Sequence, residues 1–317
     1  MARPSVIAHR GASGYLPEHT AEAKAAAHAM GADYLEQDIV ASRDGVLLVL
    51  HDIYLEAVTD VAVRFPDRAR ADGHFYVIDF DYAEIAQLNL RERMTADPES
   101  RAGAARQLFA DRFPADRGRF RVSTFEAELE LIAGLNHSTG RAAGIYPEIK
   151  DPAWHRDNGI DLTHLVVTAL EDHGYFAAVG SEGRPAAFLQ CFDAQELRSI
   201  RRTIDPPVPL VQLLTADDDF TPAALDAIAE YAQGIGPGYQ SLVGNENGGV
   251  IPNAVCTNAH ARGLIVHPYT FRRDRLPPFA ADFTALIRLF AIDVGIDGLF
   301  TDFPDIAVEV LDEIGLN

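Results

Sequence analysis

Residues 6–39 read VIAHRGASGYLPEHTAEAKAAAHAMGADYLEQDI, and this segment indicates a strand–helix–strand unit. The apolar runs at 6–8 and 34–39 predict two strands, and the alanine-rich segment at 21–30 predicts a helix between them. Two strands separated by a helix are typical of a parallel pair joined by a crossover connection.

The same alternation continues along the rest of the chain. Further apolar runs predict strands at residues 145–149, 187–191, 209–213, 265–266 and 299–300, with a weaker one at 234–236. Segments of helical length and period lie at residues 161–173, 194–204, 222–232, 253–262 and 279–294. About eight such units predict a closed parallel (β/α)8 TIM barrel, an α/β fold, with residues 1–317 as one domain.

One apolar run does not fit a parallel barrel. Residues 46–51 follow the second strand after a short segment that contains Asp44 and Gly45, a strong hairpin signal. Parallel strands need a longer connection, so this run should fold back antiparallel on the second strand. A two-residue loop would place His51 opposite Asp38, and a bulge would shift that register by one residue.

The stretch at residues 52–122 also breaks the rhythm. It is rich in aspartate and arginine and occupies the place of a single strand–helix loop. A structureless loop of that length is uncommon in a compact domain. We therefore expect residues 52–122 to form an inserted subdomain or lid over the barrel, within the same domain.

Composition limits the partners of the protein. The formal net charge is −20, and the only lysines are Lys24 and Lys150. An acidic surface repels nucleic acid and anionic membranes, so we expect neither as a partner. No apolar stretch approaches the roughly 20 residues that span a bilayer, which argues against membrane insertion. An anionic substrate then requires a locally positive site, and a bound cation is the simplest way to provide it.

The first residues, Met1-Ala2-Arg3-Pro4, show no apolar signal segment. This start predicts a cytoplasmic protein as written, or a periplasmic one if a leader was removed. A homodimer is left open by the sequence.

Charged residues recur on one face of two predicted strands. Glu36 and Asp38 are two positions apart, and so are Glu148 and Lys150 at the end of the third strand. Carboxylates that point into a barrel repel one another unless a cation lies between them. The alternative for Glu36 and Asp38 is that this face of the strand points outward. The alternative for Glu148 and Lys150 is a surface ion pair. Together, Glu36, Asp38 and Glu148 supply the hard oxygen ligands that Ca²⁺ and Mg²⁺ prefer.

Basic residues lie where a barrel places its active site. His9 and Arg10 follow the first strand, and the carboxyl ends of barrel strands face the active site. His9 and His51 can flank a metal as proton-transfer groups, while Arg10 and Lys150 add charge for phosphate. A histidine–arginine pair standing alone at a strand end is structural more often than catalytic.

These residues belong to motifs that resemble, as a set, the glycerophosphodiester phosphodiesterase family. In chain order they are Ala8-His9-Arg10-Gly11-Ala12, Leu16-Pro17-Glu18-His19-Thr20, Glu36-Gln37-Asp38, Asp44-Gly45 through His51-Asp52, Pro147-Glu148-Ile149-Lys150 and Thr301-Asp302-Phe303-Pro304. The long segment after His51 resembles that of the larger, often periplasmic bacterial members. His19 stands where many members have Asn, and a capping or loop role is expected for it.

The resemblance implies a phosphoric diester hydrolase. Its substrates would be small glycerophosphodiesters, such as glycerophosphocholine or glycerophosphoethanolamine, and its products glycerol 3-phosphate and an alcohol. The implied roles are acid/base catalysis for His9 and His51, Ca²⁺ or Mg²⁺ binding for Glu36, Asp38 and Glu148, and phosphate binding for Arg10 and Lys150. Asp302 is expected only to turn the chain into the last helix.

Four more residues near strand ends are expected to contact substrate. Gln190 could hydrogen-bond it, and Phe192, Tyr269 and Phe271 could wall its glycerol half; ordinary packing is an equal alternative for each ring. The sequence leaves open the head group, the metal, which histidine is the acid, and whether water attacks directly or after a cyclic phosphate. A phospholipase and a barrel that only binds its ligand are the rival functions.

Overall fold

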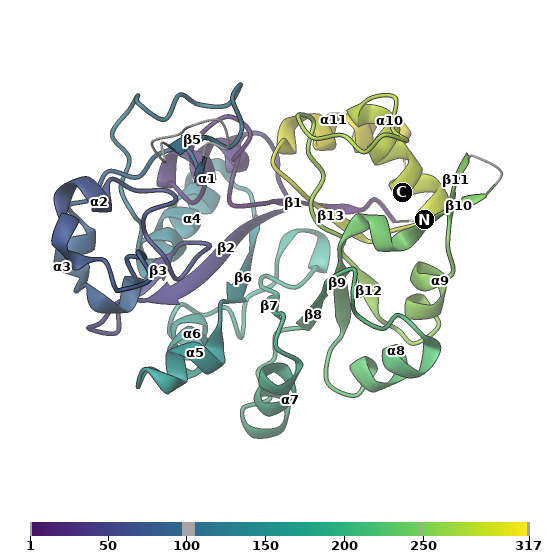
Figure 1. The fold of residues 1–317 in the computed structure, drawn as a ribbon. Coiled ribbons are helices and arrows are strands. Elements are labelled where there is room, and N and C mark those ends of the chain that lie inside the picture. Colours follow the sequence, from purple (N-terminus) through teal and green to yellow (C-terminus); the bar gives the residue numbers. More distant parts are fainter. Residues whose placement is uncertain (1, 97–104, 247–248, 316–317) are drawn as a thin grey trace.

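Eight parallel strands surround the centre of the computed structural model, which describes residues 2–96, 105–246 and 249–315 (Figure 1). In sheet order they run β12-β9-β8-β7-β6-β2-β1-β13. Their bounds in chain order are β1 (Ser5–Ala8), β2 (Tyr34–Ala41), β6 (Gly144–Ile149), β7 (Leu189–Cys191), β8 (Leu210–Leu214), β9 (Gly234–Pro237), β12 (Ile265–Val266) and β13 (Gly298–Thr301). Each of the strands expected from the apolar runs is present, including the weak one at 234–236.

The barrel nearly closes between β12 and β13. The Asp297 amide donates to the Val266 carbonyl at 3.0 Å, and the Phe300 amide donates to the Pro268 carbonyl at 3.0 Å. Inside the barrel, aromatic and branched side chains fill the lumen; they are Ile7, Tyr34, Tyr146, Phe188, Val211 and Phe300. The predicted TIM barrel is therefore confirmed.

Helices form the outer layer of the barrel. They are α1 (Ala21–Ala29), α4 (Phe125–Thr139), α5 (Pro152–Asp157), α6 (Leu162–Asp172), α7 (Ala194–Thr203), α8 (Pro222–Ala229), α9 (Val255–His260), α10 (Phe283–Arg288) and α11 (Pro304–Ile314). The helix expected at 279–294 begins late, because the Asp282 side chain caps α10, and it continues as a π-helical turn at Leu289–Val294. No helix in the described part of the chain is long and apolar enough to cross a membrane.

The hairpin after β2 is present with a different register. Strand β3 (Leu47–Val49) pairs antiparallel with β2, and the Leu50 amide donates to the Asp38 carbonyl at 2.9 Å. Asp38 is therefore opposite Leu50, and the prediction that it faces His51 is wrong by one residue. The loop holds three residues instead of two, with Gly45 at φ 78° in the left-handed region that such loops use.

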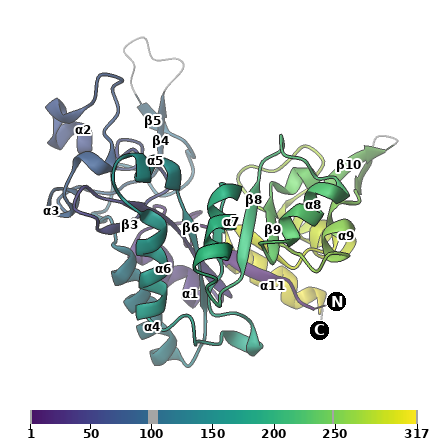
Figure 2. The same cartoon turned by 90° about the horizontal axis from the view of Figure 1, so that it is seen from below.

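Short elements and irregular chain connect β3 to α4. They are α2 (Val61–Arg64), the 3₁₀ turns η1 (Pro66–Arg68) and η2 (Val77–Asp79), α3 (Tyr82–Ile85), β4 (Met94–Ala96) and β5 (Ala105–Gln107). Figure 2 shows these elements grouped beyond β3, at one side of the barrel. Their apolar residues, among them Val61, Phe80 and Leu90, pack with β3 in a cluster of their own. The inserted-subdomain or lid role of residues 52–122 stays a prediction, and residues 97–104 of that range lie outside the described residues.

Smaller elements complete the described chain. The 3₁₀ turns η3 (Ser181–Gly183) and η4 (Tyr239–Leu242) precede β7 and follow β9. An antiparallel pair, β10 (Val243–Glu246) and β11 (Gly249–Pro252), projects from the barrel before α9.

Candidate active site

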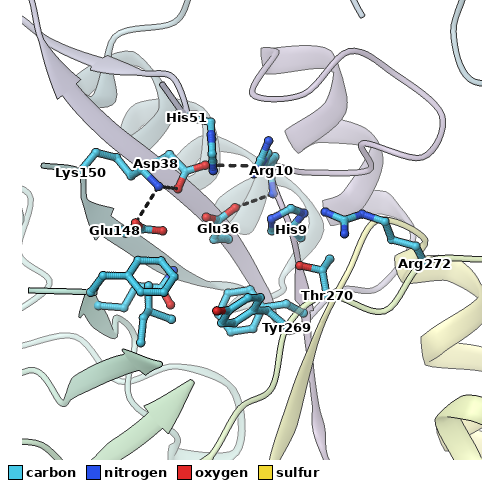
Figure 3. Close-up of a pocket in the computed structure, with 14 residues that line it drawn as sticks. His9, Arg10, Glu36, Asp38, His51, Glu148, Lys150, Tyr269, Thr270 and Arg272 are labelled. Carbon is cyan, nitrogen blue, oxygen red and sulfur yellow. Dashed lines mark hydrogen bonds and ion pairs between the residues drawn. The ribbon is translucent and has the colours of Figure 1, made fainter. Parts of the chain in front are cut away.

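A cavity of about 190 Å³ lies at the carboxyl ends of the barrel strands (Figure 3). Its lining residues are His9, Arg10, Glu36, Asp38, His51, Glu148, Lys150, Gln190, Phe192, Leu213, Tyr269, Thr270, Arg272 and Phe300. The structure thus brings together every residue that the sequence proposed for the site, except Phe271. The roles of these residues remain predictions.

Phe271 does not line this cavity, so the expectation that it walls the site is wrong. Its side chain is fully buried, and its ring centre lies 5.0 Å from that of Tyr239 and 5.2 Å from that of Phe290. The ring therefore packs into the layer between barrel and helices, while its chain neighbours Thr270 and Arg272 line the cavity.

The three carboxylates come from adjacent strands. Asp38 on β2 is in register with Glu148 on β6, and Glu36 accepts a hydrogen bond from the Arg10 amide at 2.5 Å. Arg10 has φ 58°, a left-handed backbone conformation that is uncommon outside glycine. All three carboxyl groups are buried, so their charges depend on nearby cations.

The nearby cations are too few to keep all three buried carboxylates ionised. Burial, with Asp38 nearby, raises the pKa of Glu36 well above its ordinary value. Burial raises the pKa of Glu148 to about 8 despite the Lys150 ammonium 2.8 Å away. Burial opposes ionisation of Asp38 too, but Lys150 and His51 outweigh it and hold its pKa well below the usual range. A divalent cation among these oxygens would relieve the repulsion, so the donor set fits Ca²⁺ or Mg²⁺.

His19 lies in the loop before α1, and its ring makes a contact that the sequence does not predict. It is 1% exposed, and its Nε2 lies 2.7 Å from Asp38 Oδ2, whereas Thr20 caps α1. One potential ligand atom from each of His19, Glu36 and Asp38 lies within 4.8 Å of the others, which makes this trio a second candidate metal set. No sequence spacing pairs His19 with Asp38, because the contact joins a loop to a strand.

His9 is held by the carboxylate of Asp302, a residue that the sequence predicts only to turn the chain into the last helix. His9 Nδ1 lies 2.6 Å from Asp302 Oδ1, and Asp302 Oδ2 accepts from Arg112 and Arg272 at 2.7 Å each. Burial opposes ionisation of Asp302, but Arg272 and His9 hold its pKa well below the usual range. An ionised Asp302 requires the proton on Nδ1, which leaves His9 Nε2 as the free nitrogen.

Burial, together with the charge of Arg10, lowers the pKa of His9 to about 4. The ring is therefore neutral at neutral pH and can accept a proton. Asp302 follows the last barrel strand directly, so its position at a strand end was the signal that could have identified it.

His51 has a matching partner on the other side. Its Nδ1 lies 2.5 Å from Asp52 Oδ1, and Arg93 donates to Asp52 Oδ2 at 2.6 Å. Burial and the nearby Arg10 lower the pKa of His51 as well. Arg93, like Arg112, comes from the chain between β3 and α4, so that segment supports both histidines through their aspartates.

Two cations and a polar wall complete the cavity. Arg10 lies 3.4 Å from Asp38 and 3.0 Å from Glu18, and Lys150 contacts Glu148. Gln190 is buried, and its Oε1 has no hydrogen-bond partner in the described chain. A buried acceptor without a partner, at the wall of a cavity, can accept a hydrogen bond from a ligand hydroxyl. Phe192 is 41% exposed beside the Tyr269 ring, 6.0 Å away between ring centres.

Fold and site together define a TIM-barrel enzyme whose cavity combines two aspartate-bound histidines with a carboxylate cluster. The model of the glycerophosphoryl diester phosphodiesterase family matches residues 9–306. The glycerophosphodiester phosphodiesterase of Haemophilus influenzae is 40% identical over 333 aligned positions, covering 96% of this chain and 89% of that protein. The chain belongs to the glycerophosphoryl diester phosphodiesterase family, as its motifs predicted.

Solved structures agree with this assignment. A Silicibacter pomeroyi protein assigned to the same family has a TM-score of 0.73 and 25% identity, with 100% of this chain and 95% of that chain covered. An Oleispira antarctica phosphodiesterase, solved with its product sn-glycerol-3-phosphate, has a TM-score of 0.66 and 19% identity over 98% and 97% of the two chains.

Proposed function

We propose that this protein hydrolyses small glycerophosphodiesters to sn-glycerol 3-phosphate and an alcohol, with a divalent metal and two histidines. The observation that carries the proposal is the pair of histidines, each tied through Nδ1 to an aspartate, on a cavity with three carboxylates. The product bound in the Oleispira antarctica relative supports the same substrate class.

Glu36, Asp38 and Glu148 would hold Ca²⁺ or Mg²⁺, and the bound ion would polarise a phosphate oxygen and offset its charge. Arg10 and Lys150 would contact the remaining phosphate oxygens, since both line the cavity and both are cations. Gln190 would accept a hydrogen bond from a glycerol hydroxyl, with Phe192 and Tyr269 against the carbon chain.

The proton transfers need one neutral histidine as the base and one protonated histidine as the acid. One histidine accepts the proton of the attacking hydroxyl at Nε2 as its oxygen bonds to phosphorus. The bond from phosphorus to the alcohol oxygen breaks, and that oxygen receives the Nε2 proton of the other histidine, which enters the step as imidazolium. Overall, one water is consumed for each diester. The attacking hydroxyl is water itself or, in a two-step route, the glycerol 2-hydroxyl, with water opening the cyclic phosphate.

Release of sn-glycerol 3-phosphate from glycerophosphocholine and glycerophosphoglycerol, in the presence of Ca²⁺ or Mg²⁺, tests the proposal. His9→Ala and Glu36→Ala should each lower kcat by about a hundredfold or more. His137→Ala, which removes an exposed histidine on α4, should leave kcat unchanged. Full activity in His9→Ala, or no release by the wild type from either diester, would refute the assignment.

A further inference from the structure

A second hollow of about 160 Å³ adjoins the active-site cavity. It is lined by His9, Arg10, Ser13, Glu18, His51, Arg93, Leu108, Phe109, Arg112, Arg272, Arg275 and Asp302. The two cavities share His9, Arg10, His51 and Arg272. Both histidines therefore stand at the boundary between the two spaces.

Arginine dominates this second hollow, which we call the arginine hollow. Five of its lining residues are arginines, against the two acids Glu18 and Asp302. The chain as a whole has a formal charge of −20, so this local excess of positive charge runs against the composition. Such a concave, positive surface attracts anions.

Part of this charge is available to a ligand. Arg93 and Arg112 each bind two carboxylates, whereas Arg272 donates only its Nε to Asp302. The side chain of Arg275 makes no hydrogen bond or ion pair with the residues that the structure describes. Arg272 and Arg275 thus present unused guanidinium nitrogens, which suit the oxygens of a phosphate.

The two cavities divide the substrate at the reacting bond. The first cavity alone contains the three candidate metal ligands, Gln190 and the rings of Phe192 and Tyr269. These groups suit a metal-bound phosphate and glycerol. A substrate with its phosphorus between the histidines would extend its departing alcohol into the arginine hollow. The charge of that alcohol then decides how well it binds.

We propose that the arginine hollow binds the alcohol half of the substrate and favours diesters whose alcohol carries a second phosphate. The inference rests on the proposed function and adds the class of alcohol to it. A cationic head group such as choline meets like charge in the hollow, whereas a phosphate monoester meets the unused guanidinium nitrogens of Arg272 and Arg275.

Three substrates test the preference: glycerophosphocholine, glycerophosphoglycerol, and glycerophosphoglycerol with a phosphate on its second glycerol. We expect kcat/KM to be about tenfold higher for the phosphorylated substrate than for glycerophosphoglycerol at low salt, and this ratio to fall as salt screens the charges. Arg275→Gln should lower the ratio by about threefold, as expected for one exposed charge pair, through KM.

Arg273→Gln is the matched control. It removes the same charge from the same loop, but Arg273 lies over the rings of Tyr15 and Phe303 and outside the arginine hollow. In this variant, the ratio of kcat/KM for the phosphorylated substrate to that for glycerophosphoglycerol should equal the wild-type ratio. Equal kcat/KM for all three substrates, or equal effects of the two variants, would overturn this inference and leave the proposed function intact. No hydrolysis of any of the three would overturn both.

Discussion

Each active-site histidine is supported by an aspartate, and each aspartate by at least one arginine. Asp302 fixes the His9 ring, and Asp52 fixes the His51 ring, both through Nδ1. Such pairs set the tautomer of the ring and stabilise its charged form during proton transfer. We propose that these aspartates are positioning residues for the histidines.

Asp302→Asn should therefore lower kcat by about a hundredfold, with KM changed much less, because His9 loses the partner that orients its proton. The pH profile of kcat should shift as well, a change that a purely structural role would not produce. Asp305→Asn, which removes a carboxylate that accepts from Tyr15 on the same side of the barrel, is the control and should retain kcat. An unchanged kcat in Asp302→Asn would contradict the role of the pair.

Residue patterns predicted the cavity lining well and its supporting contacts poorly. Strand ends and alternation identified His9, Glu36 and Glu148, because barrel geometry brings those positions to one end. The contacts of His19 and Asp302 could not be predicted because their partners are distant in sequence: Asp302 lies 293 residues from His9. Phe271 was misplaced because the chain after β12 is irregular, so alternation no longer tells which way a side chain points.

Among the elements, the β2–β3 hairpin matters most, since it delivers His51 to the site. Its loop contains Gly45 at φ 78°, and a side chain added there would meet no atom within 4 Å. A change at this position therefore acts through backbone strain alone. The Asp44–Gly45 signal predicted the hairpin, but dipeptide identity could not separate a two-residue loop from a three-residue one.

Gly45→Ala should lower the free energy of unfolding by about 1 kcal/mol, the cost of a left-handed conformation for a residue with a Cβ. Gly134→Ala, within α4 and likewise free of close neighbours, should raise it by about 0.5–1 kcal/mol through helix propensity. Urea unfolding of both variants measures the difference. The same change in the free energy of unfolding in Gly45→Ala and Gly134→Ala would show that alanine is not strained in the hairpin loop.

For the whole molecule, the barrel lumen carries a pH-dependent contribution to stability. His267 is buried, and its Nδ1 lies 2.9 Å from the Tyr146 hydroxyl. Burial lowers its pKa from 6.5 to about 4 in the folded protein. Between these pH values the unfolded chain binds more protons, so the contribution is complete above pH 6.5 and is lost as the pH falls towards 4.

The free energy of unfolding lost through His267 amounts to about 3 kcal/mol between pH 6.5 and 4. His267→Gln keeps a hydrogen-bond acceptor for Tyr146 but cannot titrate, so its stability should fall less between pH 6.5 and 4. His137→Gln, at an exposed position of α4, should follow the wild type. Parallel curves for all three proteins would show that His267 does not contribute.

Metal binding should also stabilise the folded molecule. At a Ca²⁺ concentration a hundredfold above Kd, a site present only in the folded state contributes about 2.7 kcal/mol. A rise of a few degrees in Tm is expected, and Glu36→Gln, with one fewer carboxylate, should show a smaller rise at the same concentration. Equal rises in Tm for the wild type and Glu36→Gln would show that the ion binds elsewhere.

The fold as a whole followed from the order of strands and helices, since the alternation is repeated around the barrel. The chain between β3 and α4 was harder, because its short helices and strands carry no clear period. We propose that this segment acts as a lid, since Arg93 and Arg112 reach from it to the aspartates of the site. Its apolar cluster explains how it holds them in place.

Metal held by the three carboxylates is tested by the release of sn-glycerol 3-phosphate from glycerophosphoglycerol by protein stripped of metal with a chelator, before and after metal is restored. We expect negligible release by the stripped protein and recovery with Ca²⁺ or Mg²⁺, with little recovery in Glu36→Ala. Full activity in the stripped protein would contradict a metal held by the three carboxylates.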